Sequence, residues 1–285
     1  MIIALILADQ TAPLIRNSLP YLLPVGDESV IERVARVVLR GPFGATVIAS
    51  PASSAKELKS ALNGFVVQYA TLPIAGPGTM ASLTAALKFS EEFRARWEKA
   101  RAAAAQRFNA DDDDEDDEEE EDDDDEGGAA PSKSPGKSRT TSSKSQPASK
   151  DTRAEWSKHS ANADVKVRGL ARSFERDGVM LFRGESPLLR PELQAQMVES
   201  FAREAQQKGP KARPFAQAVH AGARGFPVLI DRAAIAEVMA LPPSVVFDDW
   251  LLDQLTRVQD VQLQEGAALE RIRNEEDYAA LLKTL

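Results

Sequence analysis

Short apolar runs alternate with amphipathic stretches along most of the chain. Residues 1–8, 45–49 and 65–69 are apolar runs with the length of buried strands. Between them, residues 30–38 place apolar side chains on one helical stripe, and residues 55–62 form a second short helical pattern. The order strand, helix, strand, helix, strand predicts an α/β fold with a largely parallel sheet.

Local signals mark several helix starts. Ser29, with Glu32 three residues later, fits a capping box at the start of the first helix. Asp231 is expected to cap the helix that contains residues 235–241. Both positions follow from the chemistry of unpaired amide groups in a first helical turn.

The most informative stretch is residues 177–193. Residues 179–182 form one short apolar strand, which Gly184 ends and Glu185 follows. Pro191 suits the first turn of the next helix. An acidic side chain thus leaves the carboxyl end of a central strand, where ligands bind in open α/β sheets. Glu185 either holds a divalent cation against nucleotide phosphates or is a solvated residue of an ordinary turn.

The remaining elements complete a Rossmann-like three-layer sandwich with a mostly parallel central sheet. Helices are predicted at residues 80–108, 154–176, 192–207, 246–255 and 275–285, and strands at 215–219, 228–230 and 258–263. A tight loop at residues 221–227 is expected to join the first two of these strands as a hairpin-like unit.

A charged insertion changes how the net charge of −9 is interpreted. Residues 111–126 are an unbroken acidic run of 16, so the rest carries 44 − 16 = 28 acidic against 35 basic residues, about +7. We predict a disordered insertion at 109–150 that divides one domain into halves at 1–108 and 151–285. The acidic run is either a site for a basic protein partner, a competitor of nucleic acid for a basic surface, or a tolerated surface insertion.

Composition excludes several classes of protein. The chain has no cysteine and two histidines, so neither a disulfide framework nor a thiolate or histidine zinc site is expected. His220 precedes a glycine turn and is interpreted as a turn residue. The apolar N-terminus lacks a basic region before it, and no apolar run reaches membrane-spanning length, so we expect a soluble cytoplasmic protein without a membrane partner. GxxxxGK[ST], GxGxxG and GxSxG motifs are absent.

Four residues besides Glu185 are candidates for ligand binding. Gly78 lies in a Gly-Pro-Gly loop that either lets the backbone approach a ligand or simply turns. Ser82, in the first turn of a helix, either reaches a ligand or caps that helix. Arg224 in its glycine loop either grips a phosphate or carboxylate or is solvated. Arg16 lies in the polar loop after the first strand.

The spacing of these segments resembles the MobA-like NTP transferase family, which includes the molybdenum cofactor cytidylyltransferases and guanylyltransferases. The matching segments are LLPV at 22–25, IERV at 31–34, SL at 82–83, GESPLL at 184–189, PEL at 191–193, GARGFPVLIDR at 222–232 and RIRNEEDY at 271–278.

The resemblance implies a GT-A-like nucleotidyltransferase fold. It also implies transfer of a nucleotidyl group from an NTP to a small phosphorylated acceptor, such as a molybdopterin-type cofactor, with release of pyrophosphate. Mg²⁺ would bind at Glu185, and Arg16, Gly78, Ser82 and Arg224 would contact the nucleotide or acceptor. We expect no nucleic-acid partner.

The chain departs from the family pattern at several positions. Residues 8–13 (ADQTAP) replace the glycine-rich phosphate loop, and Pro20 falls near the position of its lysine. Phe226 replaces a histidine, and Arg271 and Arg273 replace two aspartates. These departures favour a second interpretation, a catalytically degenerate member that binds a nucleotide or a protein partner as a scaffold.

Overall fold

The structure is a computed structural model, and it describes part of the chain. The described residues are 1–8, 14–73, 80–111 and 176–284, with the side chains of 106–111 excepted. The candidate Gly78, most of the predicted insertion and nearly all of the predicted helix at 154–176 lie outside them. The chain divides into one unit of residues 1–94 and 162–285 and a second of residues 95–161.

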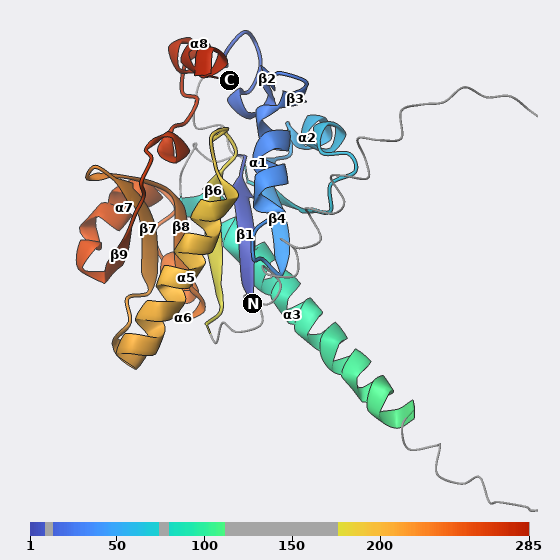
Figure 1. Cartoon of the computed structure of the whole chain (residues 1–285). Coiled ribbons are helices and arrows are strands. Elements are labelled where there is room, and N and C mark those ends of the chain that lie inside the picture. The colour runs from blue at the N-terminus through green and yellow to red at the C-terminus, as the bar shows by residue number, and fades with distance from the viewer. Residues whose placement is uncertain (9–13, 74–79, 112–175, 285) are drawn as a thin grey trace, which may run out of the picture. The chain divides into compact units, whose positions relative to one another are not determined.

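Seven strands of the described residues form the central sheet of the first unit (Figure 1). They are β1 (Ile2–Leu7), β4 (Ala45–Pro51), β5 (Gln68–Leu72), β6 (Gly178–Arg183), β7 (Phe215–His220), β8 (Ala223–Asp231) and β9 (Val258–Gln262). Their order is β5-β4-β1-β6-β8-β7-β9, and every neighbouring pair is parallel except those that β8 makes. The prediction of a largely parallel sheet is therefore confirmed.

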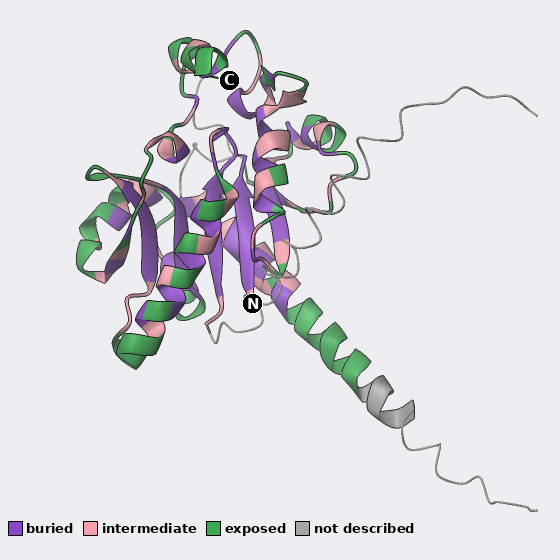
Figure 2. Cartoon of the chain, viewed as in Figure 1, coloured by how far each residue is buried: buried purple, intermediate pink, exposed green. Residues whose placement is uncertain are grey.

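Helices cover both faces of this sheet. The α-helices of the described residues are α1 (Val30–Val38), α2 (Ala55–Ala61), α3 (Met80–Asp111), α5 (Pro191–Lys208), α6 (Arg232–Met239), α7 (Phe247–Asp253) and α8 (Glu275–Thr284). Apolar residues of α1 and α5 join one core with one face of β1 and β6, and those of α3, α6 and α7 join a second core with the other face. The central strands β1 and β6 are consequently buried on both sides (Figure 2), and the predicted three-layer sandwich is confirmed.

Both predicted helix caps are present. Glu32 accepts a hydrogen bond from the backbone N–H of Ser29 at 2.7 Å, and the Ser29 hydroxyl accepts one from the N–H of Glu32 at 3.4 Å. Asp231 accepts a hydrogen bond at 2.7 Å from the N–H of Ala233 in the first turn of α6. These ends are set by local chemistry, which explains why the sequence predicts them.

The predicted loop at 221–227 is wrong. β8 begins at Ala223, and its pairing with β7 continues to the His220–Ala223 pair. Only Ala221 and Gly222 lie between the strands, with φ of 48° and 83°, the left-handed conformation that two-residue hairpin turns require. Ladder pairing with β7 therefore overrides the glycines and proline that suggested a longer loop.

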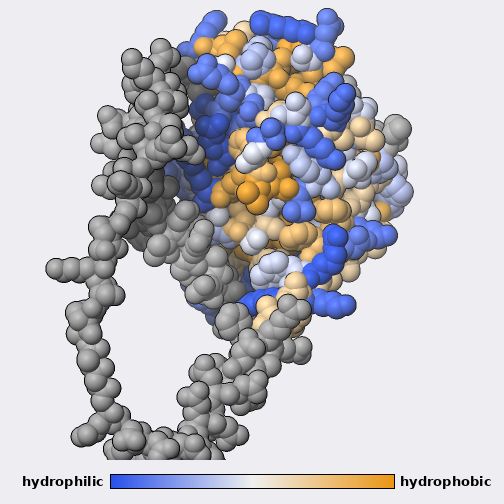
Figure 3. All heavy atoms as spheres, turned by 90° about the vertical axis from the view of Figure 1, so that its right-hand side faces the viewer, coloured by the Kyte–Doolittle hydropathy of each residue, from blue (hydrophilic) through white to orange (hydrophobic). Residues whose placement is uncertain are grey.

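Two described segments expose much of their surface. Residues 95–105 of α3, in the second unit, are exposed (Figure 2), and no described helix is long and apolar enough to cross a membrane. Within the first unit, β5 is an edge of the sheet, and Val66 just before it is 85% exposed. Figure 3 shows apolar residues gathering on the face where α2 lies.

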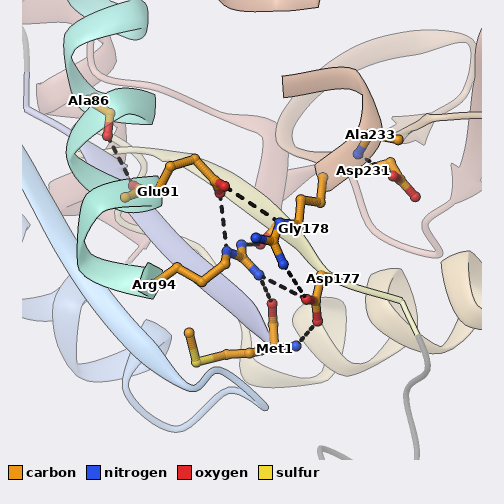
Figure 4. A network of polar contacts seen from close by, with 10 residues as sticks. Met1, Ala86, Glu91, Arg94, Asp177, Gly178, Asp231 and Ala233 are labelled. Atoms are coloured by element: carbon orange, nitrogen blue, oxygen red, sulfur yellow. Dashed lines mark hydrogen bonds and ion pairs between the residues drawn. The ribbon is translucent and has the colours of Figure 1, made fainter. Parts of the chain in front are cut away.

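A buried arginine joins the amino ends of the two central strands (Figure 4). Arg94 of α3 is fully buried and donates hydrogen bonds to the carbonyls of Met1 at 2.7 Å and Gly178 at 2.9 Å. Its guanidinium also pairs with Glu91 at 3.1 Å and Asp177 at 3.5 Å. We call these residues, together with Arg232, the Arg94 network.

Asp177 receives three positive charges in the Arg94 network, from the Met1 ammonium, Arg94 and Arg232. Burial raises the pKa of its carboxyl, but the hydrogen bond from the ammonium and the charges of the two arginines outweigh burial and lower the pKa below its ordinary value. A carboxyl with a lowered folded-state pKa adds stability above its unfolded pKa, and this is lost as the pH falls through the folded value. The network therefore contributes at neutral pH and is lost in acid.

We predict that Arg94→Met lowers the free energy of unfolding by about 3 kcal/mol, because it leaves the buried carbonyls of Met1 and Gly178 without their donor and removes one of the three positive charges at Asp177. Urea unfolding measures the change. Arg203→Met, at an arginine of α5 that is 62% exposed, is the control and should change stability by less than about 0.5 kcal/mol. Equal effects of the two substitutions would contradict a structural role for Arg94.

Candidate functional site

The strand directions bring several loops to one edge of the sheet. β1, β4, β5, β6, β7 and β9 all run parallel, so their carboxyl ends meet there, together with the amino end of the antiparallel β8. The Arg94 network lies at the opposite edge, where β1 and β6 begin. The carboxyl edge of an open α/β sheet is the usual place for a ligand site.

The turn after β6 is held tightly against β1 and α1. The N–H of Gly184 donates to the Leu7 carbonyl at 2.9 Å, and a Cβ at Gly184 would lie 3.2 Å from that oxygen and from Ile31 Cδ1. Arg33 of α1 donates to the Pro187 carbonyl at 3.0 Å. Glycine is therefore the residue that allows this close approach, and the turn is fixed by groups on both sides.

Glu185 is buried at this edge, with 3% of its surface exposed. Its carbonyl accepts a hydrogen bond at 3.0 Å from the N–H of Ile272, which links the turn to the segment before α8. The structure thus places Glu185 at the end of the central strand, as predicted, but as a buried residue and not as a solvated one. The solvated alternative is excluded by this burial.

Arg183 is a second buried charge in the same place. It is the last residue of β6, is 3% exposed, and donates to Asp248 of α7 at 3.2 Å. Its guanidinium lies 4.4 Å from the centre of the Phe226 ring, a cation–π distance. Sequence analysis missed this residue, although a charged side chain that ends an apolar strand was a signal for it.

A pocket of about 600 Å³ opens beside the Glu185 turn. Phe226 and Asp248 line it from the side of α3, α6 and α7, whereas Ile272 and Leu281 line it from the side of α1 and α5. The pocket therefore lies where the two layers meet beyond the ends of the strands. Its volume suits a small molecule.

Most charged side chains of the pocket have an opposite charge in contact. Arg224 pairs with Asp260 at 2.6 Å, Arg273 with Asp277 at 3.0 Å, and Asp248 with Arg183 at 3.2 Å. Burial raises the pKa of the Asp277 carboxyl, and the hydrogen bonds and charge of Arg273 outweigh it, so this pKa is lowered.

His220 also lines the pocket, at the carboxyl end of β7. Its Nδ1 lies 3.1 Å from the Leu263 carbonyl, which can only accept, so Nδ1 carries a hydrogen and donates it. In the neutral ring, Nε2 then holds the free electron pair. Its ring contacts Gly266, where an added Cβ would lie 2.7 Å from Cδ2. The earlier interpretation of His220 as a simple turn residue overlooked this pocket.

The other predicted ligand-binding residues lie at different places. Arg224 lines the pocket. Arg16 is exposed, pairs with Glu275 of α8 at 2.6 Å and lies 5.1 Å from the centre of the Tyr278 ring. Ser82 is buried in the first turn of α3. Their roles toward a ligand stay predictions.

The acidic side chains fit a metal ion that is bound together with a substrate better than one held by the protein alone. Among the residues that the structure describes, no group of three His, Asp or Glu side chains could hold a metal ion. Asp248 is paired with Arg183. The carboxylate of Glu185 is a hard oxygen donor at the end of β6. A single carboxylate fits Mg²⁺, which is commonly bound by one or two carboxylates together with substrate phosphates.

This α/β architecture with a mostly parallel sheet is similar in fold to solved nucleotidyltransferase structures. No protein-family model matches the sequence, and no curated protein matches it. Several solved structures are similar to the chain over nearly its whole length, and three of them are described next.

The first is Rv0371c from Mycobacterium tuberculosis H37Rv in complex with manganese, with 15% identity, a TM-score of 0.51, and 100% of this chain and 99% of that chain covered. The second is Mth528, a nucleotidyl transferase from Methanothermobacter thermautotrophicus, with 14% identity and a TM-score of 0.54. The similarity covers 100% of this chain and 99% of that chain. The third is the 4-diphosphocytidyl-2C-methyl-D-erythritol synthase of Anaerococcus prevotii, with 12% identity and a TM-score of 0.53. The similarity covers 99% of this chain and 95% of that chain. At these identities the similarity establishes the fold alone.

We predict that Gly266→Ala destabilises the protein by about 1–3 kcal/mol, because the new methyl group overlaps the His220 ring. The backbone at Gly266 has φ −79° and ψ −20°, so alanine brings no backbone strain and would otherwise stabilise by about 0.4–1 kcal/mol.

Urea unfolding in two backgrounds isolates the contact. In the His220→Ala background the clash is absent, so Gly266→Ala should be neutral or stabilising. The same destabilisation in both backgrounds would contradict the placement of His220 against Gly266.

Proposed function

We propose that the chain is a nucleotidyltransferase that transfers a nucleotidyl group from an NTP to a small phosphorylated acceptor. The single observation that supports this most is the buried Glu185 at the carboxyl end of the central strand, beside a pocket of about 600 Å³. The similarity in fold to the nucleotidyl transferase Mth528 and to the 4-diphosphocytidyl-2C-methyl-D-erythritol synthase supports nucleotidyl transfer. Within this class, the segments at 184–193 and 222–232 favour a MobA-like enzyme with a molybdopterin-type acceptor.

The reaction is an in-line displacement. An oxygen of the acceptor phosphate forms a bond to the α-phosphorus of the NTP. The bond from that phosphorus to the bridging oxygen breaks, and pyrophosphate leaves with the electron pair. Such chemistry depends on positioning and charge neutralisation more than on proton transfer, which suits a site with few histidines.

Glu185 is the proposed ligand of a divalent cation that the nucleotide phosphates share. Its rigid turn, fixed by Leu7, Arg33 and Ile272, holds the carboxylate without a large entropy cost on binding. When bound, the cation neutralises charge on the phosphates. The manganese complex of Rv0371c supports a divalent metal in proteins of this fold, and Mg²⁺ is the ion that we propose here.

The remaining candidates would act on binding. Arg224 faces the pocket at the start of β8 and would contact the acceptor, at the cost of its bond to Asp260. Ser82, in the first turn of α3, would contact the nucleotide, as would Gly78, which lies outside the described residues. Arg16 would have to leave Glu275 to reach a phosphate.

A second candidate function is binding without catalysis. Arg271 and Arg273 stand near the Glu185 turn where the resembling family has acids, and Arg16 and Arg224 are engaged by acids of the chain. A scaffold that binds a nucleotide or a basic protein partner, the latter through the acidic run at 111–126, would need no metal.

Calorimetric titration of the four common NTPs separates these functions. With Mg²⁺, we predict that the wild type binds an NTP at least about tenfold more tightly than Glu185→Gln, because the variant keeps the shape and loses the charge that holds the cation. With EDTA, the wild type and Glu185→Gln should bind the NTP equally weakly. Glu192→Gln, at an exposed acid of the first turn of α5, is the control and should bind as the wild type does.

Binding that is indifferent to both Mg²⁺ and Glu185→Gln would reject the transferase and support the scaffold. Thermal unfolding of each variant shows whether a loss of binding reflects a loss of fold.

A further inference from the structure

Arg271 differs from the other arginines that line the pocket. Arg224 and Arg273 each have a carboxylate in contact, whereas Arg271 takes part in no ion pair or side-chain hydrogen bond of the described residues. Glu270, which precedes it, is exposed, so water screens its charge. The pocket wall therefore presents one guanidinium whose five N–H donors are available.

The backbone around Arg271 is fixed. Ile272 is 2% exposed, and its N–H donates to the Glu185 carbonyl at 3.0 Å. On the other side, Ala268 in the short 3-10 helix Ala267–Leu269 is also buried. The backbone therefore holds Arg271 at the pocket wall before any ligand arrives, and only its side chain has to become ordered on binding.

The other lining groups indicate the kind of ligand. Phe226, Leu188 and Leu269 give the pocket an apolar wall. His220 lines it with Nδ1 bound to the Leu263 carbonyl, so Nε2 is the ring atom that can meet a ligand. A planar guanidinium matches the geometry of a phosphate, to which it can donate two hydrogen bonds.

We propose that this pocket binds an organic phosphate monoester, with the phosphate on Arg271 and the organic part against the apolar wall, without a metal ion. Arg271 supplies the positive charge, and the described residues around it form no metal-binding group. Only one part of this inference rests on the proposed function, namely that the bound phosphate monoester is the acceptor of the nucleotidyl group. The binding site itself stands on the pocket.

Phenyl phosphate is a suitable probe, titrated by calorimetry into the full-length protein in the presence of EDTA. We expect wild-type binding that Arg271→Gln weakens about ten- to a hundredfold, the usual loss for a charge-assisted hydrogen-bond pair. Arg271→Lys should keep part of the affinity, and Arg203→Gln on α5, at an arginine that is 62% exposed, should keep all of it. Phenol should bind far more weakly than phenyl phosphate.

Three results would overturn the proposal: no binding to the wild type, equal binding to Arg271→Gln, or binding that EDTA abolishes. Thermal unfolding and NTP titration with Mg²⁺ on Arg271→Gln separate the two proposals. Retained NTP binding with lost phenyl phosphate binding supports both. If the wild type binds phenyl phosphate but no NTP, and Arg271→Gln loses phenyl phosphate binding, the phosphate site is supported and the transferase is rejected.

Discussion

One guanidinium, that of Arg94, bonds to two carbonyl oxygens at the start of neighbouring strands, those of Met1 and Gly178. β1 and β6 are paired at the centre of the sheet, although most of the first half of the domain and the whole charged segment separate them in sequence. A buried cation that satisfies two backbone carbonyls and pairs with two acids, Glu91 and Asp177, tolerates little displacement. The register of these two strands, and with it the carboxyl edge of the sheet, depends on this contact.

The two edges of the sheet therefore have different tasks. At the amino edge, charges are matched within the chain, with Asp177 facing Arg94, Arg232 and the Met1 ammonium. At the carboxyl edge, Glu185 is buried at the end of β6 and Arg271 lines the pocket. A rigid sheet between the edges holds these groups in place, as a site built on strand ends requires. The sheet is thus stabilised by matched charges at its amino edge, whereas Glu185 and Arg271 lie where a ligand could bind at its carboxyl edge.

Features set by neighbours in sequence could be predicted, and features set by distant contacts could not. The capping box at Ser29, the cap at Asp231 and the strand before Gly184 follow from a few adjacent residues. The start of β8 depends on its partner β7, and the burial of Arg94 depends on carbonyls 84 and 93 residues away. The pocket was hidden for the same reason, since strands, a hairpin and the segment before α8 meet only in the folded chain.

The central claim is that a nucleotide and a divalent cation bind together at Glu185. The most direct measurement is anomalous diffraction from crystals grown with Mn²⁺ and non-hydrolysable NTP analogues. The account predicts a manganese peak between the Glu185 carboxylate and the nucleotide phosphates at the carboxyl edge of the sheet, and no such peak in Glu185→Gln. A nucleotide bound at that edge without manganese, or neither ligand there at saturating concentration, would contradict it.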